Sequence, residues 1–353
     1  MTRRSPATAH DVARLAGVSQ SAVSRAFTPK ASVSAETRAK IVEAASALNY
    51  RPNALARSLT TRRSRVIGLV AAYLQNHFYP DVLEALSARL QARGYHVLLF
   101  TAGADHPADP LLDDIIGHRV DGIVLASTSL SSHLAEECRT AGIPVLLFNR
   151  TAAADGVSSV TGENERGGRL LARFLVAGGH RRIAFMAGVE NSSTSRDRET
   201  GFGQGLAEAG LRLHRRVVGH YRFEAAAAAA RALLADPEPP DALFCANDHM
   251  ALAAMEVARH EFGLQLPRDL SVAGFDDVGT ARWPSFALTT FSQPVDAMVQ
   301  EAVDLVGALV EDPAAAPRHA VVRGELMVRG SARLPPGCRT VGDRMVWPDG
   351  EVG

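Results

Sequence analysis

The chain has 353 residues, more than a single hydrophobic core usually organises, so two or three domains are expected. Hydrophobic residues make up 46% and charged residues 22% of the sequence, proportions that exclude wholesale disorder. No apolar run approaches the roughly 18 residues of a membrane helix, because the longest, such as Val66–Ala72, have the length of a strand. The first residues lack the apolar centre of an export signal, so a cytoplasmic location is expected.

The net charge of zero conceals an uneven distribution. Residues 1–65 carry twelve basic and three acidic side chains, and the rest of the chain has a matching excess of acids. A basic head on an acidic body suggests that the head binds a polyanion, although a solvated tail gives the same charge run. The three cysteines, Cys138, Cys245 and Cys338, are too widely spaced for a zinc site or a disulfide framework, and we expect no metal and no cofactor.

The basic head begins with two short helices joined by a tight turn. Thr8 and an acid three residues later, Asp11, are typical of a helix start, and Gly17 ends this first helix. Ser19 caps a second helix over residues 20–27. The spacing predicts a helix-turn-helix, in which the second helix enters the major groove of DNA.

The outward side chains of this second helix suit the reading of base edges. Glutamine and arginine make two-pronged hydrogen bonds with adenine and guanine, and serine binds phosphate or base. The side chains are Gln20, Ser21, Ser24 and Arg25. A third helix over residues 34–48 is expected to close the small core of the head with Ile41, Val42, Ala45 and Leu48.

The segment that follows, residues 49–59, contains a second candidate DNA contact. Pro52 suits the first turn of a short helix that carries Leu59 on one face with Arg57 beside it. A short helix with an apolar residue and flanking arginine is typical of a wedge that enters the minor groove and kinks DNA. An interdomain linker is the alternative interpretation.

Several motifs of the head, at fixed spacing, resemble the LacI/GalR family of bacterial repressors. They are Asp11-Val12-Ala13, Ala16-Gly17-Val18-Ser19, Val23-Ser24-Arg25, Val33-Ser34 and Tyr50-x-Pro52-Asn53-x-x-Ala56-x-x-Leu59. The resemblance spans the whole head. It implies a homodimer that binds a pseudo-palindromic operator in double-stranded DNA, with paired hinge helices that insert a leucine at the central step.

The resemblance also implies roles for individual residues. Leu59 is the inserted leucine, and Gln20, Ser21 and Arg25 read bases. Backbone or hinge contacts fall to Thr8, Ser19, Ser24, Asn53 and Arg57. Phe27-Thr28 departs from the family pattern of an apolar residue followed by asparagine, so the phosphate contact of that asparagine is not carried over.

From residue 65 onward, strand-like and helix-like segments alternate. Strands are expected at 66–72, 95–100, 122–126, 144–148, 182–187, 241–246 and 271–275, with short β segments at 320–330. Helices are expected at 81–93, 109–118, 131–141, 164–177, 198–209, 224–234, 248–262 and 295–310. This order predicts parallel sheets with helices on both faces, in two doubly wound lobes that place a ligand at the carboxyl ends of their strands.

The expected fold is therefore a small all-α helix-turn-helix head followed by an α/β body of two doubly wound parallel-sheet lobes. The resemblance implies that the body has the type 1 periplasmic-binding-protein fold, with three crossings between lobes. We expect a DNA-binding domain at 1–49, a hinge helix and linker at 50–64, an effector-binding and dimerisation domain at 65–334, and a flexible tail at 335–353. The first lobe comprises about 65–160 and 291–320, and the second about 161–290 and 321–334.

The side chains that line the cleft should lie just past the carboxyl ends of the strands. A guanidinium opposed by asparagine and aspartate suits vicinal hydroxyls of a sugar, and an aromatic ring can stack on its apolar face. The candidates are His77, Phe78, Tyr79, Ser127, Asn149, Arg150, Asn191, Arg198, Asn247 and Asp276. The resemblance supports three of them through the motifs Arg198-x-x-Gly-Phe, Asn247-Asp248 and Gly274-Phe275-Asp276. Asn247 could instead only cap a helix, and Asp276 could only pair with Arg282.

These observations predict a DNA-binding transcriptional regulator, a repressor whose operator affinity is controlled by a small molecule, a sugar or sugar derivative, bound between the lobes. A sugar acid, a nucleoside or a purine fits the same residue types, and induction and co-repression are both open. One alternative is a sugar-binding protein without a regulatory role. The other is an enzyme, which we do not expect, because the dinucleotide, P-loop, nucleophile-elbow and zinc-protease motifs are absent from the sequence. The cluster Gly201–Gly205 falls within a helix, where it permits close packing.

Overall fold

The computed structural model describes residues 7–27, 31–51, 63–72, 74–101, 111–126, 132–152 and 156–348. The chain divides into two compact units, Met1–Arg65 and Val66–Gly353. Within the described ranges, no helix combines the length and the apolar composition that crossing a membrane requires.

The head unit is a three-helix structure with α1 (Ala9–Ala16), α2 (Gln20–Ala26) and α3 (Ala35–Ala47). The predicted caps are confirmed. Thr8 and Asp11 form a reciprocal capping box, Gly17 ends α1 in the left-handed conformation with φ 66°, and the Ser19 side chain accepts a hydrogen bond from the backbone of Ala22. These local signals fix the tight turn between the two helices.

The core of the head consists of Val12, Val23 and Ile41 with small alanines around them. The expectation that Val42 closes this core is wrong, because its side chain is 50% exposed. Ile41, Ala44, Ala45 and Leu48 recur at helical spacing on one face of α3, and position 42 lies a third of a turn away from that face.

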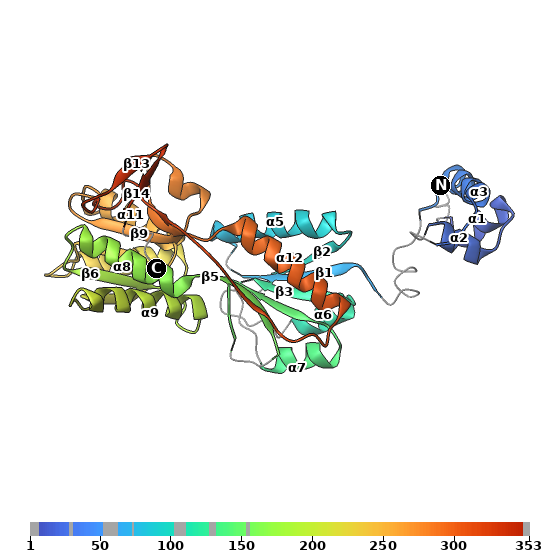
Figure 1. The fold of residues 1–353 in the computed structure, drawn as a ribbon, viewed down its shortest axis with the longest axis horizontal. Helices are drawn as coiled ribbons and strands as arrows, with labels where there is room; N and C mark the ends of the chain where they lie inside the picture. The colour runs from blue at the N-terminus through green and yellow to red at the C-terminus, as the bar shows by residue number, and fades with distance from the viewer. Residues whose placement is uncertain are drawn as a thin grey trace. The chain divides into compact units, whose positions relative to one another are not determined.

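The body contains two six-stranded sheets (Figure 1), as the α/β alternation predicts. The first has the order β11-β5-β4-β3-β1-β2, and all its strands run parallel. Its strands are β1 (Val66–Ala71), β2 (His96–Thr101), β3 (Gly122–Ala126), β4 (Val145–Phe148), β5 (Ser158–Gly162) and β11 (His319–Val322). Two helices, α5 (Phe78–Ala92) and α12 (Val295–Glu311), cover one face; α6 (Leu112–Gly117) and α7 (Ser132–Thr140) cover the other (Figure 1).

The second sheet has the order β12-β10-β9-β8-β6-β7, with only β12 antiparallel to its neighbour. Its strands are β6 (Ile183–Ala187), β7 (Arg215–Val218), β8 (Ala242–Cys245), β9 (Ser271–Asp276), β10 (Thr289–Ser292) and β12 (Leu326–Met327). Two helix pairs pack on it, α8 (Asn164–Ala177) with α9 (Ser193–Glu208) and α10 (Phe223–Leu234) with α11 (Asp248–His260). The chain passes between the sheets three times, after β5, after β10 and after β11.

Several features differ from the sequence-based expectations. β5, β7 and β10 were not predicted as strands; β5 is polar despite its burial, and β7 begins with two arginines. Helix α9 was expected to begin at 198 and begins at Ser193. The expectation of a flexible tail is also wrong for residues 335–348, because this segment contains a hairpin of β13 (Arg339–Val341) and β14 (Arg344–Val346). Trp347 anchors this hairpin; its ring is 5% exposed and packs edge-on against Phe174 of α8 at 5.6 Å.

Close packing of α8 against α9 depends on glycines, as predicted for the cluster that begins at Gly201. A Cβ on Gly201 would lie 1.9 Å from the Glu165 carbonyl oxygen, and one on Gly168 would lie 2.2 Å from the Arg198 carbonyl oxygen. Both obstacles are backbone atoms, which cannot move aside without separating the helices. Gly203, on the exposed side of α9, has nothing within 4 Å of the same position.

We therefore expect Gly201→Ala to destabilise the protein by about 1–3 kcal/mol or more, because the added methyl group pushes α9 away from α8. Gly203→Ala is the matched control and should be neutral or stabilising by up to about 1 kcal/mol, since alanine favours the helix. Urea unfolding of the two variants measures both effects. Equal stabilities would contradict the close approach of the two helices.

Candidate functional site

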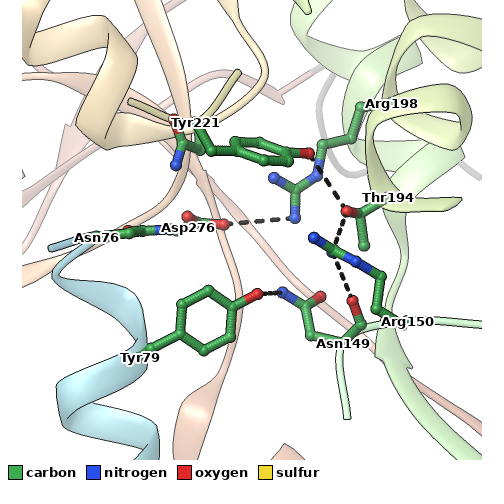
Figure 2. A pocket seen from close by; sticks show the side chains of 9 residues that line it. Asn76, Tyr79, Asn149, Arg150, Thr194, Arg198, Tyr221 and Asp276 are labelled. Carbon is green, nitrogen blue, oxygen red and sulfur yellow. Dashed lines mark hydrogen bonds and ion pairs between the residues drawn. The ribbon is translucent and has the colours of Figure 1, made fainter. Parts of the chain in front are cut away.

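A small polar cavity lies where the carboxyl ends of the two sheets meet. Figure 2 shows that side chains from both lobes point into it. The first lobe contributes residues that follow β1 and β4, and the second contributes the start of α9 and the residues that follow β7, β8 and β9. The lining residues are Asn76, Tyr79, Asn149, Arg150, Thr194, Arg198, Tyr221, Asn247 and Asp276.

Arg198 is the most constrained of these side chains, being 2% exposed. Its Nε donates to Asn164 Oδ1 at 2.8 Å, and its Nη1 donates to the carbonyl oxygen of Ala246. The guanidinium stacks on Phe275 at 3.8 Å and its Nη2 lies 3.4 Å from Asp276 Oδ1. A buried charge needs such partners, so α8, β8 and β9 together hold this guanidinium in one orientation.

Asp276 faces this guanidinium from the end of β9. It is fully buried, accepts a hydrogen bond from Gln293 Nε2 at 2.7 Å, and has a positive φ of 119°. Burial raises the pKa of Asp276 to about 6, although Arg198 and Gln293 act in the opposite direction. The alternative expectation, that Asp276 pairs with Arg282, is wrong. Arg282 pairs with the next residue instead, because its Nη2 lies 2.8 Å from Asp277 Oδ2.

A second buried carboxylate, Asp248, supports the loop that carries Asp276. It accepts hydrogen bonds from Thr290 Oγ1 at 2.6 Å and from the backbone of Val278 at 2.9 Å. Burial and the neighbouring Asp276 carboxylate raise the pKa of Asp248 well above its ordinary value. Asp248 does not line the cavity.

Contacts across the cavity join the two lobes. Arg150 Nη1 of the first lobe donates to Thr194 Oγ1 of the second at 2.5 Å, and the Thr151 backbone donates to Ser193 Oγ at 3.0 Å. Within the first lobe, Asn149 Nδ2 donates to the Tyr79 hydroxyl at 3.3 Å (Figure 2). Asn149 has a φ of 57°, a left-handed conformation that asparagine tolerates better than most residues.

The cavity has unused hydrogen-bonding capacity. Among the described residues, none forms a hydrogen bond with Asn149 Oδ1, Asn247 Nδ2 or Arg198 Nη2, although all three atoms are buried. Buried polar atoms of this kind are costly unless a ligand or water satisfies them. The enclosed volume of about 10 Å³ is that of about one water molecule, so a larger ligand requires the lobes to separate or side chains to move.

The structure brings together six of the ten predicted cleft residues: Tyr79, Asn149, Arg150, Arg198, Asn247 and Asp276. Asn247 also caps α11, because its Oδ1 accepts from the Met250 backbone at 3.0 Å. Phe78 was expected in the cleft, and this is wrong, since its ring is 2% exposed within the apolar core. His77 and the exposed Asn191 do not line the cavity either. Ser127 lies outside the described residues.

Three lining residues were not predicted individually. Asn76 precedes α5 in the same loop as predicted candidates, and Thr194 falls inside the stretch after β6 from which only Asn191 and Arg198 were taken. Tyr221 follows β7, which the sequence did not reveal as a strand. Its hydroxyl lies 3.3 Å from Thr194 Oγ1 (Figure 2).

In the head, the outer face of α2 carries the predicted base-reading side chains. Gln20, Ser21, Ser24 and Arg25 are all exposed, while Val23 and Ala26 of the same helix are buried. Thr8 and Ser19 are exposed helix caps. The predicted hinge residues Asn53, Arg57 and Leu59 lie outside the described residues.

Comparison with known proteins gives matches over both units. Residues 8–53 match the bacterial regulatory proteins of the lacI family, and residues 172–332 match a periplasmic binding protein-like domain. The chain is 34% identical to the ribose operon repressor of Escherichia coli K12, over 92% of this chain and 100% of that protein. It is 31% identical to the probable HTH-type transcriptional repressor ExuR of Bacillus subtilis, over 92% and 98%.

Comparison with solved structures also gives matches over most of the chain. A lac repressor dimer bound to operator and an anti-inducer superimposes with a TM-score of 0.82 at 28% identity, over 93% of this chain and 99% of that one. A complex of the transcriptional regulator CelR with cellobiose has a TM-score of 0.70 at 30% identity, over 92% and 100%.

The raised pKa of Asp276 predicts a specific dependence of stability on pH. Between its ordinary value of 3.8 and about 6, the folded protein holds a proton that the unfolded chain has released, so this group's contribution to stability falls as pH rises. Relative to Asp276→Asn, the wild type should lose roughly 1 kcal/mol of unfolding free energy between pH 5 and pH 7. Parallel urea titrations measure this difference. Identical pH profiles would show that Asp276 is not held in the buried environment described above.

Proposed function

Because the chain belongs to the lacI family of bacterial regulatory proteins, we propose that it is a transcriptional repressor whose affinity for a DNA operator is controlled by a small molecule bound between its two lobes. The observation that carries the proposal is the presence, in one chain, of a helix-turn-helix with an exposed polar face and a buried cavity with unsatisfied polar atoms. In this assignment residues 1–49 bind DNA, 50–64 form the hinge, and 65–334 bind the effector and dimerise.

DNA recognition is assigned to α2 and to the hinge. The exposed Gln20, Ser21 and Arg25 have the hydrogen-bonding groups to read bases in the major groove. Thr8, Ser19, Ser24, Asn53 and Arg57 are proposed to make backbone or hinge contacts, and Leu59 is proposed to insert into the minor groove. The local excess of basic residues in the head supplies the attraction to phosphate.

The effector is proposed to be a sugar or a sugar derivative. Both donors and acceptors line the cavity: the Arg198 guanidinium and Asn247 Nδ2 can donate, while the Asp276 carboxylate and Asn149 Oδ1 can accept. Adjacent hydroxyls of a sugar need both kinds of partner, and Tyr79 or Tyr221 offers a ring for an apolar face. The comparison with the ribose operon repressor and the CelR–cellobiose complex supports this ligand class.

Control of DNA binding is proposed to pass through the separation of the lobes. The cavity has room for about one water molecule, so a sugar must bind to a more open arrangement or to a repacked one. An effector that favours one arrangement shifts the equilibrium between them by its differential affinity. The link between β1 and the hinge then allows the hinge helices to form or to melt.

The active form is proposed to be a homodimer. β2 is an edge strand of the first sheet, and it exposes an apolar surface in which Leu99 is 47% exposed. The second lobe presents Trp283 with 57% of its surface exposed. Large apolar side chains at an exposed edge are typical of an interface. Helix α5, expected at 81–93, packs beside β2 and is proposed to belong to the same interface. The similarity to a lac repressor dimer supports a dimer.

The readout role of Arg25 gives a direct test. Arg25→Ala should weaken binding to the operator upstream of the gene by roughly 1–3 kcal/mol and relax the preference at one position of each half-site. Arg14→Ala is the control, because this exposed arginine lies on α1 and pairs with Asp11. Fluorescence anisotropy with singly substituted operators measures both. An equal loss on every DNA sequence would assign Arg25 to phosphate, and no loss on any DNA would remove α2 from the interface.

A further inference from the structure

Two histidines from opposite lobes meet next to the cavity without lining it. His77 immediately precedes α5 of the first lobe, and His249 lies in the first turn of α11 in the second. Their rings are T-shaped, with centroids 6.0 Å apart. His77 Nδ1 also lies 3.1 Å from Thr280 Oγ1 of the second lobe. The His77 side chain therefore touches the second lobe at two points.

His77 and His249 are close to the site in sequence as well as in space. His77 follows Asn76, and His249 is two residues beyond Asn247, both of which line the cavity. A movement of the lobes that separates the two rings therefore also separates Asn76 from Asn247. The pair is therefore a candidate for positioning the two lobes, a role that does not require contact with the ligand.

The environment of His249 opposes a positive charge. Its side chain is 8% exposed, and no described residue forms a hydrogen bond with its Nε2. Burial, and the like charge that His77 can carry, lower the pKa of His249. The Phe223 ring packs at 6.0 Å from the imidazole, and Glu224 of the same helix acts in the opposite direction by favouring the charged form.

Three other charged groups near this contact, Asp248, Asp277 and Arg282, have partners of their own. On the segment that carries Thr280, Arg282 pairs with Asp277 at 2.8 Å. Asp248, next to His249, accepts its hydrogen bonds from Thr290 and Val278. Of the acids on these packed elements, Glu224 is the one whose charge acts on His249.

We propose that His77 and His249 form an interlobe latch that holds the lobes together while His249 is neutral and releases them when it is protonated, so that effector control depends on pH. The effector part of this statement rests on the function proposed above, whereas the latch itself does not. Here His77 and His249 are positioning residues, which act through the separation of the lobes.

Proton linkage sets the direction of the effect. Separating the lobes removes His77 from His249 and admits water, so the pKa of His249 returns towards its ordinary value of 6.5. The open form then binds a proton more tightly than the closed form. The latch is therefore intact above about pH 6.5, and it is lost as pH falls through the lower pKa of the closed form.

The separation of the lobes can be measured without any effector. Spin labels at Glu137→Cys on α7 and Arg212→Cys beyond α9 report the distance between lobes, in a Cys338→Ser background and diluted with unlabelled chain. The remaining thiols are buried; burial raises the pKa of Cys138 to about 11 and that of Cys245 further, so both resist labelling. Wild type, the double variant His77→Asn/His249→Gln and the control His260→Gln are compared at pH 7.5 and 5.5.

For wild type and His260→Gln, we expect the ratio of the closed population to the open population, read from the distance distribution, to fall by up to about tenfold for each unit by which the pH is lowered. The double variant should show a ratio that changes much less. Asp276 titrates in the opposite sense, but it is present in all three proteins, so the difference between them isolates the histidine pair. An identical pH response in the double variant, or none in the wild type, would overturn the latch.

A second measurement tests the contact itself. The imidazole resonance of His249, assigned by its absence in His249→Gln, should titrate at a higher pH in His77→Asn than in the wild type. An unchanged titration would show that His77 does not act on His249. Neither measurement uses DNA or effector, so failure of the proposed function and failure of the latch give different results.

Discussion

The site depends on one buried charge. The Arg198 guanidinium is excluded from water, and a charge in that position is tolerated only when each side of it is occupied by a partner. Asn164 of α8, the Ala246 carbonyl just after β8, and Phe275 and Asp276 of β9 supply those partners. The same contacts that compensate the charge therefore also define the second-lobe wall of the cavity.

The backbone around Arg198 allows these partners to reach the buried charge. Glycines at 168 and 201 bring α8 and α9 close enough for Arg198 to reach Asn164, and the first turn of α9 also carries Thr194 towards Arg150 of the other lobe. Effector binding, lobe separation and the histidine contact at the edge of the cavity are thus carried by a few neighbouring elements. A change in one of them is transmitted to the others through direct packing.

The sequence predicted the features that follow from local or repeating signals. The caps at Thr8, Gly17 and Ser19, the alternation of strands and helices, and the polar residues after β4, β8 and β9 were all of this kind. Features that depend on tertiary context were not predicted. β5 and β7 form from polar or charged segments because neighbouring strands pair with them, so Tyr221 beyond β7 was missed. Phe78 was expected in the cleft because it follows β1, and the sequence did not reveal that it begins α5 with its ring buried in the core.

If a ligand in this cavity controls operator affinity, a change at Asn247 should alter the response to the effector. Asn247→Ser keeps a good helix cap but removes the Nδ2 donor that has no protein partner. A thermal-shift screen of sugars identifies the effector, and operator anisotropy is then measured against effector concentration. We expect unchanged operator affinity without effector, and a roughly three- to tenfold higher effector concentration for half-maximal response in the variant. An unaltered effector response, or an operator affinity already changed without effector, would contradict this expectation.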